Sequence, residues 1–552
     1  MHIVENSSAS TTGKKIYRSI LLRESYREGG KVKKRTIANL SQCTPGEIAA
    51  MKLALKHKDD LMVLGSFKES VELEEGGSVG AVWAVYQVGK RLGIEKALGT
   101  EFEGKVALWQ VMARVIDQGS RLSAVRLAQT HSACEILEMK RGFDENDLYE
   151  NLWWLADHQG EIERRLFVFR RGSIKPQLFL YDVTSSYLEG EKNYFGDYGY
   201  SRDGKKGKQQ IVIGLLCDEQ GDPVATEVFS GNTQDARTFG CQVKKVAESL
   251  GCEKVTFVGD RGMIKSTQIE QLPEGFHYIT AITKPQIERL MKRGIIQYGL
   301  FDEKVCEVEE AGIRYILRRN PVRVEEMAKS RLSKRRAVEN VVTEQNGYLS
   351  EHPRATVSAA VAKVNRKITL LRQDRWLSVK TEGRHLRLEQ NDVALKKEML
   401  LDGCYVIKTD IARDVADPHL IHDRYKDLAE VEKAFRDCKT AILEVRPVFV
   451  RSEKSTRGHV LVVMLAYLII RTLRKAWATL DMTVEEGINQ LSTLCSMEIK
   501  VKDHGSCLKI PQPREKSQEL LKALDIRMPV ALPHREVRVV TRKKLPEQRK
   551  IP

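Results

Sequence analysis

The sequence predicts an α/β protein with a mixed sheet, interrupted by a large insertion and preceded by a basic hairpin and a helical domain. Three observations support this prediction. Apolar residues recur with helical spacing from about residue 77 to 172. The spacing then becomes that of strands over 177–183, 209–218 and 223–231. After these strands, helical and strand patterns alternate, which is typical of domains that combine both elements.

Residues 1–76 form the first predicted region, and 14–40 within it predict a basic hairpin. Two basic segments flank the turn signal Gly29-Gly30, and two tyrosines are interleaved with the charges. The cations of the second segment include Lys33, Lys34 and Arg35. This pattern fits either DNA contact or an ordinary solvated hairpin face, and the sequence leaves both open.

Residues 77–172 predict a helical domain, which we expect to bind DNA. The adjacent Trp153 and Trp154 are expected to lie in its core rather than to form a platform for a ligand. A tight turn over 218–222 joins the second and third predicted strands that follow this domain.

The order of elements after residue 173 indicates a particular α/β fold. The three strands are followed by a helix over about 235–250, a strand over 254–260, a short helix and a strand over 277–283. Three antiparallel strands, a helix, a strand, a helix and a strand is the order of the ribonuclease-H-like fold. We therefore expect a core in two parts, with an insertion domain between them and a less regular, basic C-terminal region after them. The two parts of the core are expected over 173–283 and 402–475. The insertion domain is expected over 284–401 and the C-terminal region over 476–552.

Composition limits the class of protein. The formal net charge of +16 and a pI near 9.2 are typical of proteins that meet polyanions. The ten cysteines include no C-x-x-C pair, so neither a zinc site nor a disulfide framework is indicated. The N-terminus has no apolar signal core. The apolar run over 459–470 is shorter than the roughly 20 residues that span a bilayer, so we expect a buried helix in a soluble cytoplasmic protein without a membrane partner.

Two aspartates end predicted strands in matching positions. Asp182 follows the apolar run that begins at Leu178, and Asp260 ends the strand over 254–260. A lone aspartate at a strand end is usually a turn former or a helix cap. If the two strands are neighbours in one sheet, both carboxylates emerge at the same side. Such a pair indicates a metal site.

A third carboxylate comes from a predicted helix over 424–442. Tyr425, Glu432 and Lys439 recur every seven residues, which places them on one stripe of a helix. One interpretation is a solvated stripe on which Glu432 pairs with Arg436 at i+4. The other is a site that holds a metal and contacts phosphates, because a carboxylate, a tyrosine and a lysine in line provide both functions.

These residues and three further blocks resemble the DDE transposases of bacterial insertion sequences. The group in question has a Tyr-x2-Arg-x3-Glu-x6-Lys signature, and Tyr425, Glu432 and Lys439 match its spacing, whereas Leu428 stands at the arginine position. The segments YDVTSSYLEG, GNTQD and VGDRG look like the other blocks of the family. Three blocks in the family's order are a stronger indication than any one of them.

The resemblance implies a function and a set of site residues. Asp182, Asp260 and Glu432 would form a catalytic triad that binds two Mg²⁺ ions, with Mn²⁺ as a substitute. Tyr425 and Lys439 would contact DNA, and Arg424, Lys426 or Arg436 would replace the missing arginine. The enzyme would cleave the terminal inverted repeats of its element and join them to target DNA, as a dimer on DNA in the bacterial cytoplasm or nucleoid. The insertion domain would help to hold the ends, and its Trp376 would stack on an unpaired base.

Two alternatives share these residues. One is a ribonuclease-H-like nuclease without strand transfer, and the other is a DNA-binding protein descended from a transposase that has lost catalysis. The segment GYSRDGKK nearly matches a phosphate-binding loop, but Lys206 replaces the hydroxyl residue and a strand follows, so nucleotide hydrolysis is not expected. The cations of this turn are expected to contact DNA instead: Arg202, Lys205, Lys206 and Lys208.

Overall fold

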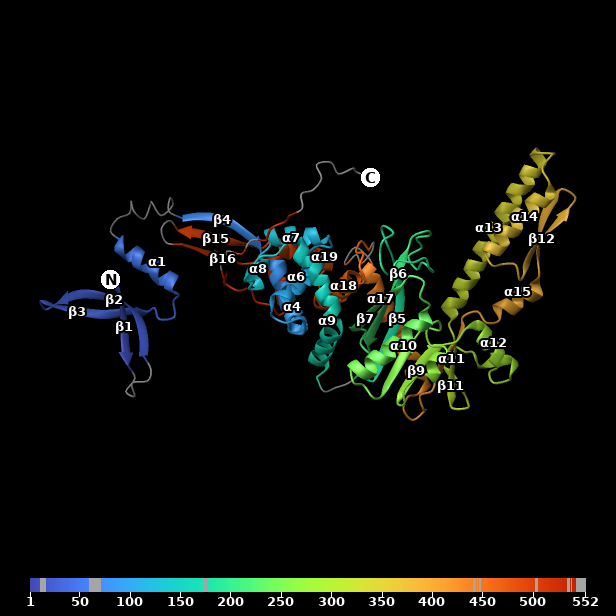
Figure 1. Ribbon diagram of the computed structural model, residues 1–552, viewed down its shortest axis with the longest axis horizontal. Helices are drawn as coiled ribbons and strands as arrows, with labels where there is room; N and C mark the ends of the chain where they lie inside the picture. Colours follow the sequence, from blue (N-terminus) through green and yellow to red (C-terminus); the bar gives the residue numbers. More distant parts are fainter. Residues whose placement is uncertain are drawn as a thin grey trace.

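The computed structural model describes residues 1–9, 16–58, 71–172, 176–439, 443, 445, 448–501, 505–533, 537 and 539–542. The molecule is elongated (Figure 1). A small N-terminal sheet lies at one end and a helical body follows it. A large central sheet comes next, and a lobe built around two long helices lies at the far end.

The N-terminal sheet contains the predicted hairpin and one strand more. β2 (Ile16–Glu28) and β3 (Lys31–Asn39) pair in antiparallel register around Gly29 and Gly30, both of which have positive φ. β1 (His2–Ala9) pairs with β2 and was not expected from the sequence. The helix α1 (Pro45–Lys56) follows, with a capping box at its N-terminus. The first basic residues of the predicted hairpin, in 10–15, lie outside the described residues.

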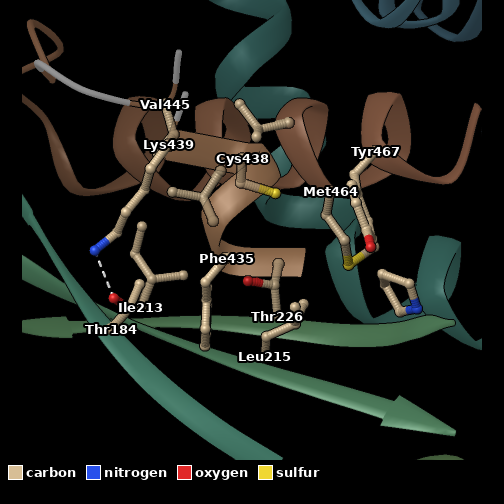
Figure 2. Close-up of a pocket in the computed structure, with 13 residues that line it drawn as sticks. Thr184, Ile213, Leu215, Thr226, Phe435, Cys438, Lys439, Val445, Met464 and Tyr467 are labelled. Carbon is tan, nitrogen blue, oxygen red and sulfur yellow. Dashed lines mark hydrogen bonds between the residues drawn. The ribbon is translucent and has the colours of Figure 1, made fainter. Parts of the chain in front are cut away.

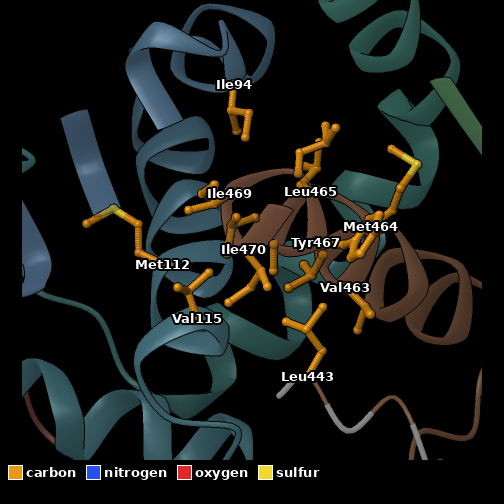
Figure 3. Close-up of a cluster of buried hydrophobic side chains, with 14 of the residues drawn as sticks. Ile94, Met112, Val115, Leu443, Val463, Met464, Leu465, Tyr467, Ile469 and Ile470 are labelled. Atoms are coloured by element: carbon orange, nitrogen blue, oxygen red, sulfur yellow. The ribbon is translucent and has the colours of Figure 1, made fainter. Parts of the chain in front are cut away.

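The helical body includes segments from both halves of the chain. The region from 80 to 171 forms α4 (Gly80–Arg91), α5 (Ile94–Leu98), α6 (Phe102–Ile116), α7 (Arg121–Thr130), α8 (Ala133–Ile136) and α9 (Glu145–Arg171), as predicted. α18 (Glu453–Ala476) packs between α6 and α9, and its Ile469 and Ile470 lie beside Met112 and Val115 of α6 (Figure 3). The sequence thus correctly predicted a buried helix over 459–470. By length and composition α18 could cross a membrane, but 83% of its most apolar 18-residue stretch is buried inside the protein.

The C-terminal region is more regular than expected. It forms α19 (Val484–Ser492), β15 (Cys495–Val501), β16 (Gly505–Lys509), α20 (Glu515–Ala523) and β17 (Ala531–Leu532). β15 pairs with β4 (Val71–Ser78), so the two ends of the chain share a sheet of order β17-β16-β15-β4. The expectation of a less regular tail is wrong here, because β15 pairs with a strand more than 400 positions earlier in the chain and β16 and β17 extend the same sheet. Most of the basic segment at 535–550 lies outside the described residues.

The central sheet has eight strands in the order β10-β11-β14-β9-β8-β5-β6-β7. The three predicted antiparallel strands are β5 (Leu178–Tyr187), β6 (Gln210–Asp218) and β7 (Pro223–Ser230). α10 (Asp235–Lys244) continues as a π-helical turn (Lys245–Ser249) and leads to β8 (Val255–Gly259). α11 (Ser266–Glu270) then leads to β9 (Phe276–Ala281). β8 runs parallel to both β5 and β9. β5 lies inside the sheet between β8 and β6, and its residues are mostly buried.

The interrupting region contributes to the same sheet. After α12 (Lys284–Lys292), β10 (Cys306–Glu310) and β11 (Ile313–Arg319) extend the sheet through β14 (Cys404–Thr409), which pairs with β9. Only the remainder forms a separate lobe: α13 (Pro321–Glu351), α14 (Val357–Leu370), β12 (Leu377–Glu382), β13 (His385–Gln390) and α15 (Asp392–Met399). This lobe has its own apolar core, which includes Val338, Val364 and Trp376.

Candidate active site

Asp182 and Asp260 lie side by side on neighbouring strands. β5 and β8 are parallel, and Tyr181 is in register with Gly259, so the next residue of each strand is the candidate aspartate. β8 ends at Gly259, but β5 continues to Tyr187 because its residues still pair with β6. The sequence had suggested that Asp182 lies at the tip of a strand. In the structure it lies inside β5. The predicted adjacency of the two carboxylates follows from the parallel pairing.

The helix that carries Glu432 is shorter than predicted. α16 (Pro418–Lys426) ends at Asp427, and α17 (Leu428–Lys439) begins directly after it, so Tyr425 and Glu432 belong to different helices. The single stripe that the seven-residue spacing predicted is wrong in this respect. α17 packs against β5 with buried Leu428, Val431 and Phe435, and leaves Glu432 exposed.

The three candidate carboxylates line one cavity of about 340 Å³. Four more charged residues line this cavity. Arg202 comes from the loop between β5 and β6 and Asp235 from the start of α10, whereas Arg436 and Lys439 come from α17. Arg202 donates two hydrogen bonds to Asp235, at 2.6 and 2.7 Å. Within the described residues no ion pair joins Glu432 and Arg436, so the i+4 pairing of a solvated stripe is not the arrangement found.

Burial dominates the electrostatics of Asp182. It is the main cause that raises the pKa of Asp182 to about 7; the charges of Asp260 and Glu432 also raise this pKa, whereas the backbone hydrogen bond from Val183 (2.8 Å) and the charge of Arg202 lower it. Near neutral pH this carboxyl group is therefore close to its midpoint of protonation. Positive charge added beside such a buried carboxylate would favour its charged form.

Tyr425 of α16 contacts one of the three carboxylates. Its hydroxyl donates a long hydrogen bond of 3.5 Å to Oδ1 of Asp260, which also accepts from the backbone N–H of Arg261 at 2.7 Å. Burial raises the pKa of Tyr425, and the charge of Asp260 raises it further. Tyr425 is therefore a neutral hydroxyl beside the Asp260 carboxylate.

Lys439 is not on an exposed stripe. Its Nζ donates to Thr184 Oγ1 (Figure 2) and lies 2.8 Å from Oδ1 of Asp203, and the side chains of Lys439 and Asp203 are only 11% and 2% exposed. The interpretation of a solvated stripe is wrong for Lys439, because a carboxylate from the loop between β5 and β6 reaches it. Lys439 also lines a small apolar cavity of about 30 Å³ between α17, α18 and the sheet.

The other predicted DNA contacts are spread over two regions. On the N-terminal sheet Lys34 is exposed, while Lys33 pairs with Glu28 at 2.8 Å and Arg35 with Glu24 at 2.7 Å. In the loop between β5 and β6, Lys205 and Lys206 are exposed. Lys208 in that loop pairs with Glu189 at 3.0 Å. The structure does not bring these two regions together, because they lie at different parts of the elongated molecule (Figure 1).

Burial and pairing bear on three further expectations. Trp376 is 2% exposed in the core of the inserted lobe, so it does not present a ring for stacking. Trp154 packs against the helical core as predicted, but Trp153 is 48% exposed. Among the candidates for the missing arginine, Arg424 pairs with Asp427 at 3.3 Å and Lys426 is exposed outside the cavity lining, whereas Arg436 lines the cavity.

Two residues of the cavity region were not singled out from the sequence. Asp235 begins α10 and holds Arg202, and Asp203 holds Lys439. Asp235 is the last residue of the GNTQD block, so that block could have indicated it. Asp203 lies in a basic turn, and no sequence motif indicated it. Among the residues that the structure describes, no group of three or more His, Cys, Asp or Glu side chains is arranged to hold a metal ion. The three candidate carboxylates thus share a cavity without forming a closed ligand set.

Comparison with known families identifies the chain. A family model described as the transposase DDE domain matches residues 173–469, more than half of the sequence. The chain belongs to the DDE transposases. A second model, the IS1634 family transposase N-terminal domain, matches residues 6–62, so this is a transposase of an insertion sequence.

Two further comparisons add little to the family assignment. No curated protein matches the transposase by sequence. One solved structure that it resembles is a piggyBac transposase synaptic complex with hairpin DNA. The sequence identity is 9% and the TM-score 0.35, over 76% of this chain and 69% of that chain, a similarity that does not establish a shared fold.

Proposed function

We propose that this transposase cleaves the ends of its insertion sequence and joins them to target DNA at the cavity between β5, β8 and α17. The observation that carries the proposal is the placement of Asp182 and Asp260 in register on parallel strands, with Glu432 lining the same cavity. The strand order β7-β6-β5-β8-β9 and the predicted order of elements support a ribonuclease-H-like core. The net charge of +16 supports DNA as the partner.

Asp182, Asp260 and Glu432 are the proposed ligands of Mg²⁺, as two ions, with Mn²⁺ as a substitute. The donor set fits, because hard divalent cations bind carboxylate oxygens and the cavity lining contains neither a thiol nor an imidazole. The raised pKa of Asp182 points the same way, since positive charge would keep this carboxyl group ionised at neutral pH. When bound, the metal would activate the attacking oxygen and stabilise the entering and leaving oxygens of the phosphodiester.

The remaining residues of the site would position the DNA. Tyr425 orients the Asp260 carboxylate through its hydroxyl. Arg436 is our candidate for the cation that replaces the signature arginine at Leu428, because it faces the cavity without an ion pair to Glu432. Lys439 would become available to a phosphate only after leaving Asp203. The basic N-terminal sheet and helical body would recognise the terminal inverted repeats. A dimer would hold two ends together, in the bacterial cytoplasm or nucleoid.

Joining of ends to target DNA separates this proposal from its two alternatives. The terminal sequence is first selected with the full chain from random DNA, and a duplex carrying it is then incubated with Mg²⁺ and a supercoiled target. Transposition predicts cleaved ends that become covalently joined to the target. Cleaved ends without joined products would indicate a nuclease, and binding without cleavage would indicate a protein that has lost catalysis.

A further inference from the structure

The loop between β5 and β6 displays exposed aromatic rings. Tyr194, Tyr198 and Tyr200 are 69%, 60% and 82% exposed, and all three lie within seven residues of one another. A cluster of exposed rings is a feature of interaction sites, since the exposed faces gain free energy on burial. The proposed cleavage reaction does not use these rings.

This loop is held rigidly against the sheet. Asp197 exchanges two backbone hydrogen bonds with Gln210, at 3.1 and 2.9 Å. The Gln210 side chain donates to the carbonyl of Tyr200 at 3.2 Å and to that of Gly231 at 2.9 Å. A Cβ at Gly199 would lie 2.1 Å from the Gly231 oxygen, so only glycine allows this close approach. The rings on either side of Gly199 are therefore presented in a fixed place, which lowers the entropy cost of binding a partner.

Tyr200 lies at the rim of the carboxylate cavity. The guanidinium carbon of Arg202 is 6.0 Å from the centroid of the Tyr200 ring, and Arg202 itself lines the cavity. Two hydrogen bonds to Asp235 fix the guanidinium in this position. A group stacked on Tyr200 would thus lie beside the part of the cavity that Arg202 lines.

The charges around the ring favour nucleic acid over protein as the partner. Lys205 and Lys206 follow Tyr200 in the same loop, and both are exposed. Lysine is depleted in the cores of protein interfaces. Aromatic rings combined with cations, in contrast, are the means by which proteins bind single strands, because every base has a face that stacks. A paired duplex keeps its bases stacked inside and offers no such face except at an end.

We propose that Tyr200 stacks on an unpaired or terminal base of the DNA next to the scissile phosphate, while Lys205 and Lys206 contact the adjoining backbone. This inference rests on the proposed function, because it assumes that DNA occupies the carboxylate cavity. It adds a specific preference: the transposase binds a DNA end better when the flank beside the cleavage point is unpaired.

The test compares two DNA probes in binding to the full chain. Both carry the selected end sequence; one continues into a paired flank and the other into an unpaired thymidine flank with 2-aminopurine at its first position. Ca²⁺ replaces Mg²⁺ so that no cleavage occurs. The variants are Tyr200→Ala, Tyr200→Phe and, as a matched control, Tyr348→Ala, which removes a 47% exposed tyrosine from the inserted lobe. Melting temperatures show that each variant is folded.

We expect wild type to prefer the unpaired flank and to quench 2-aminopurine. Tyr200→Ala should lose about tenfold in affinity for that probe, within the range found for removal of one stacking ring, and should keep its affinity for the paired probe. Tyr200→Phe and Tyr348→Ala should resemble wild type. Equal affinities of wild type and Tyr200→Ala for the unpaired probe would overturn the inference, and so would an equal loss on both probes. A change of oligomeric mass in Tyr200→Ala without a loss of quenching would indicate a second copy as the occupant. Failure of wild type to bind either probe would contradict the proposed function itself.

Discussion

Replacing Asp182 by Asn should stabilise the metal-free transposase at neutral and alkaline pH. The folded-state pKa of Asp182 is raised from 3.8 to about 7, so above pH 7 the folded protein must hold an unfavourable buried charge that the unfolded chain exposes to water. Between pH 4 and 7 the folded state binds more protons at this group than the unfolded state, so its contribution to stability falls as pH rises. The asparagine can still accept the hydrogen bond from Val183.

The size of the effect follows from the shift. About three pKa units at 1.36 kcal/mol each give an upper value of about 4 kcal/mol above pH 7, and little difference is expected near pH 4. Urea unfolding of wild type and Asp182→Asn, each in EDTA at several pH values from 4 to 8, measures it. Asp414→Asn, at an exposed position outside the cavity lining, is the control. A stability difference that does not change with pH, or a variant less stable than wild type at pH 8, would refute the reasoning.

Three other predictions concern binding and packing. Lys439→Ala should lower the free energy of unfolding by about 3 kcal/mol, because it removes the cation from a largely buried pair with Asp203. In urea unfolding, the double variant Lys439→Ala/Asp203→Asn should lose less stability than the sum of the losses in the two single variants. Trp376→Ala should destabilise the inserted lobe by about 3 kcal/mol or more, as for a buried ring, and hydrogen exchange should show the loss confined to that lobe. Affinity for the terminal DNA should fall steeply with salt, and deletion of residues 1–76 should shrink the footprint on the ends; an unchanged footprint would move recognition to the helical body.

The parts of the fold that could be predicted depend on local pattern. β5 and β8 are short apolar runs with an aspartate directly after Tyr181 and Gly259, and the order of elements along the chain made them neighbours. Parallel pairing then brings Asp182 and Asp260 together without any knowledge of side-chain positions. The buried helix α18 was equally clear, since its apolar residues occupy all of its faces.

Long-range pairing could not be predicted in the same way. The seven-residue spacing continues through Asp427 without a glycine or proline, yet the chain divides there because α16 packs against β8 and β9 while α17 packs against β5. Lys439 looked like a surface residue because its partner, Asp203, lies 236 positions earlier. Spacing shows which residues share a face of a helix, but not which other segment covers that face.

Cleavage by a Glu432→Gln variant tests the central claim most directly. The substitution keeps the shape of an exposed side chain and removes the charge of one of the three candidate metal ligands that line the cavity. Mg²⁺-dependent nicking at the selected end sequence is measured together with binding to the same DNA, and Asp414→Asn, at an exposed position outside the cavity lining, is the control. We predict that Glu432→Gln binds the end with unchanged affinity but does not cleave it. Nicking near the wild-type rate would show that Glu432 does not act with Asp182 and Asp260, and would contradict the proposed site.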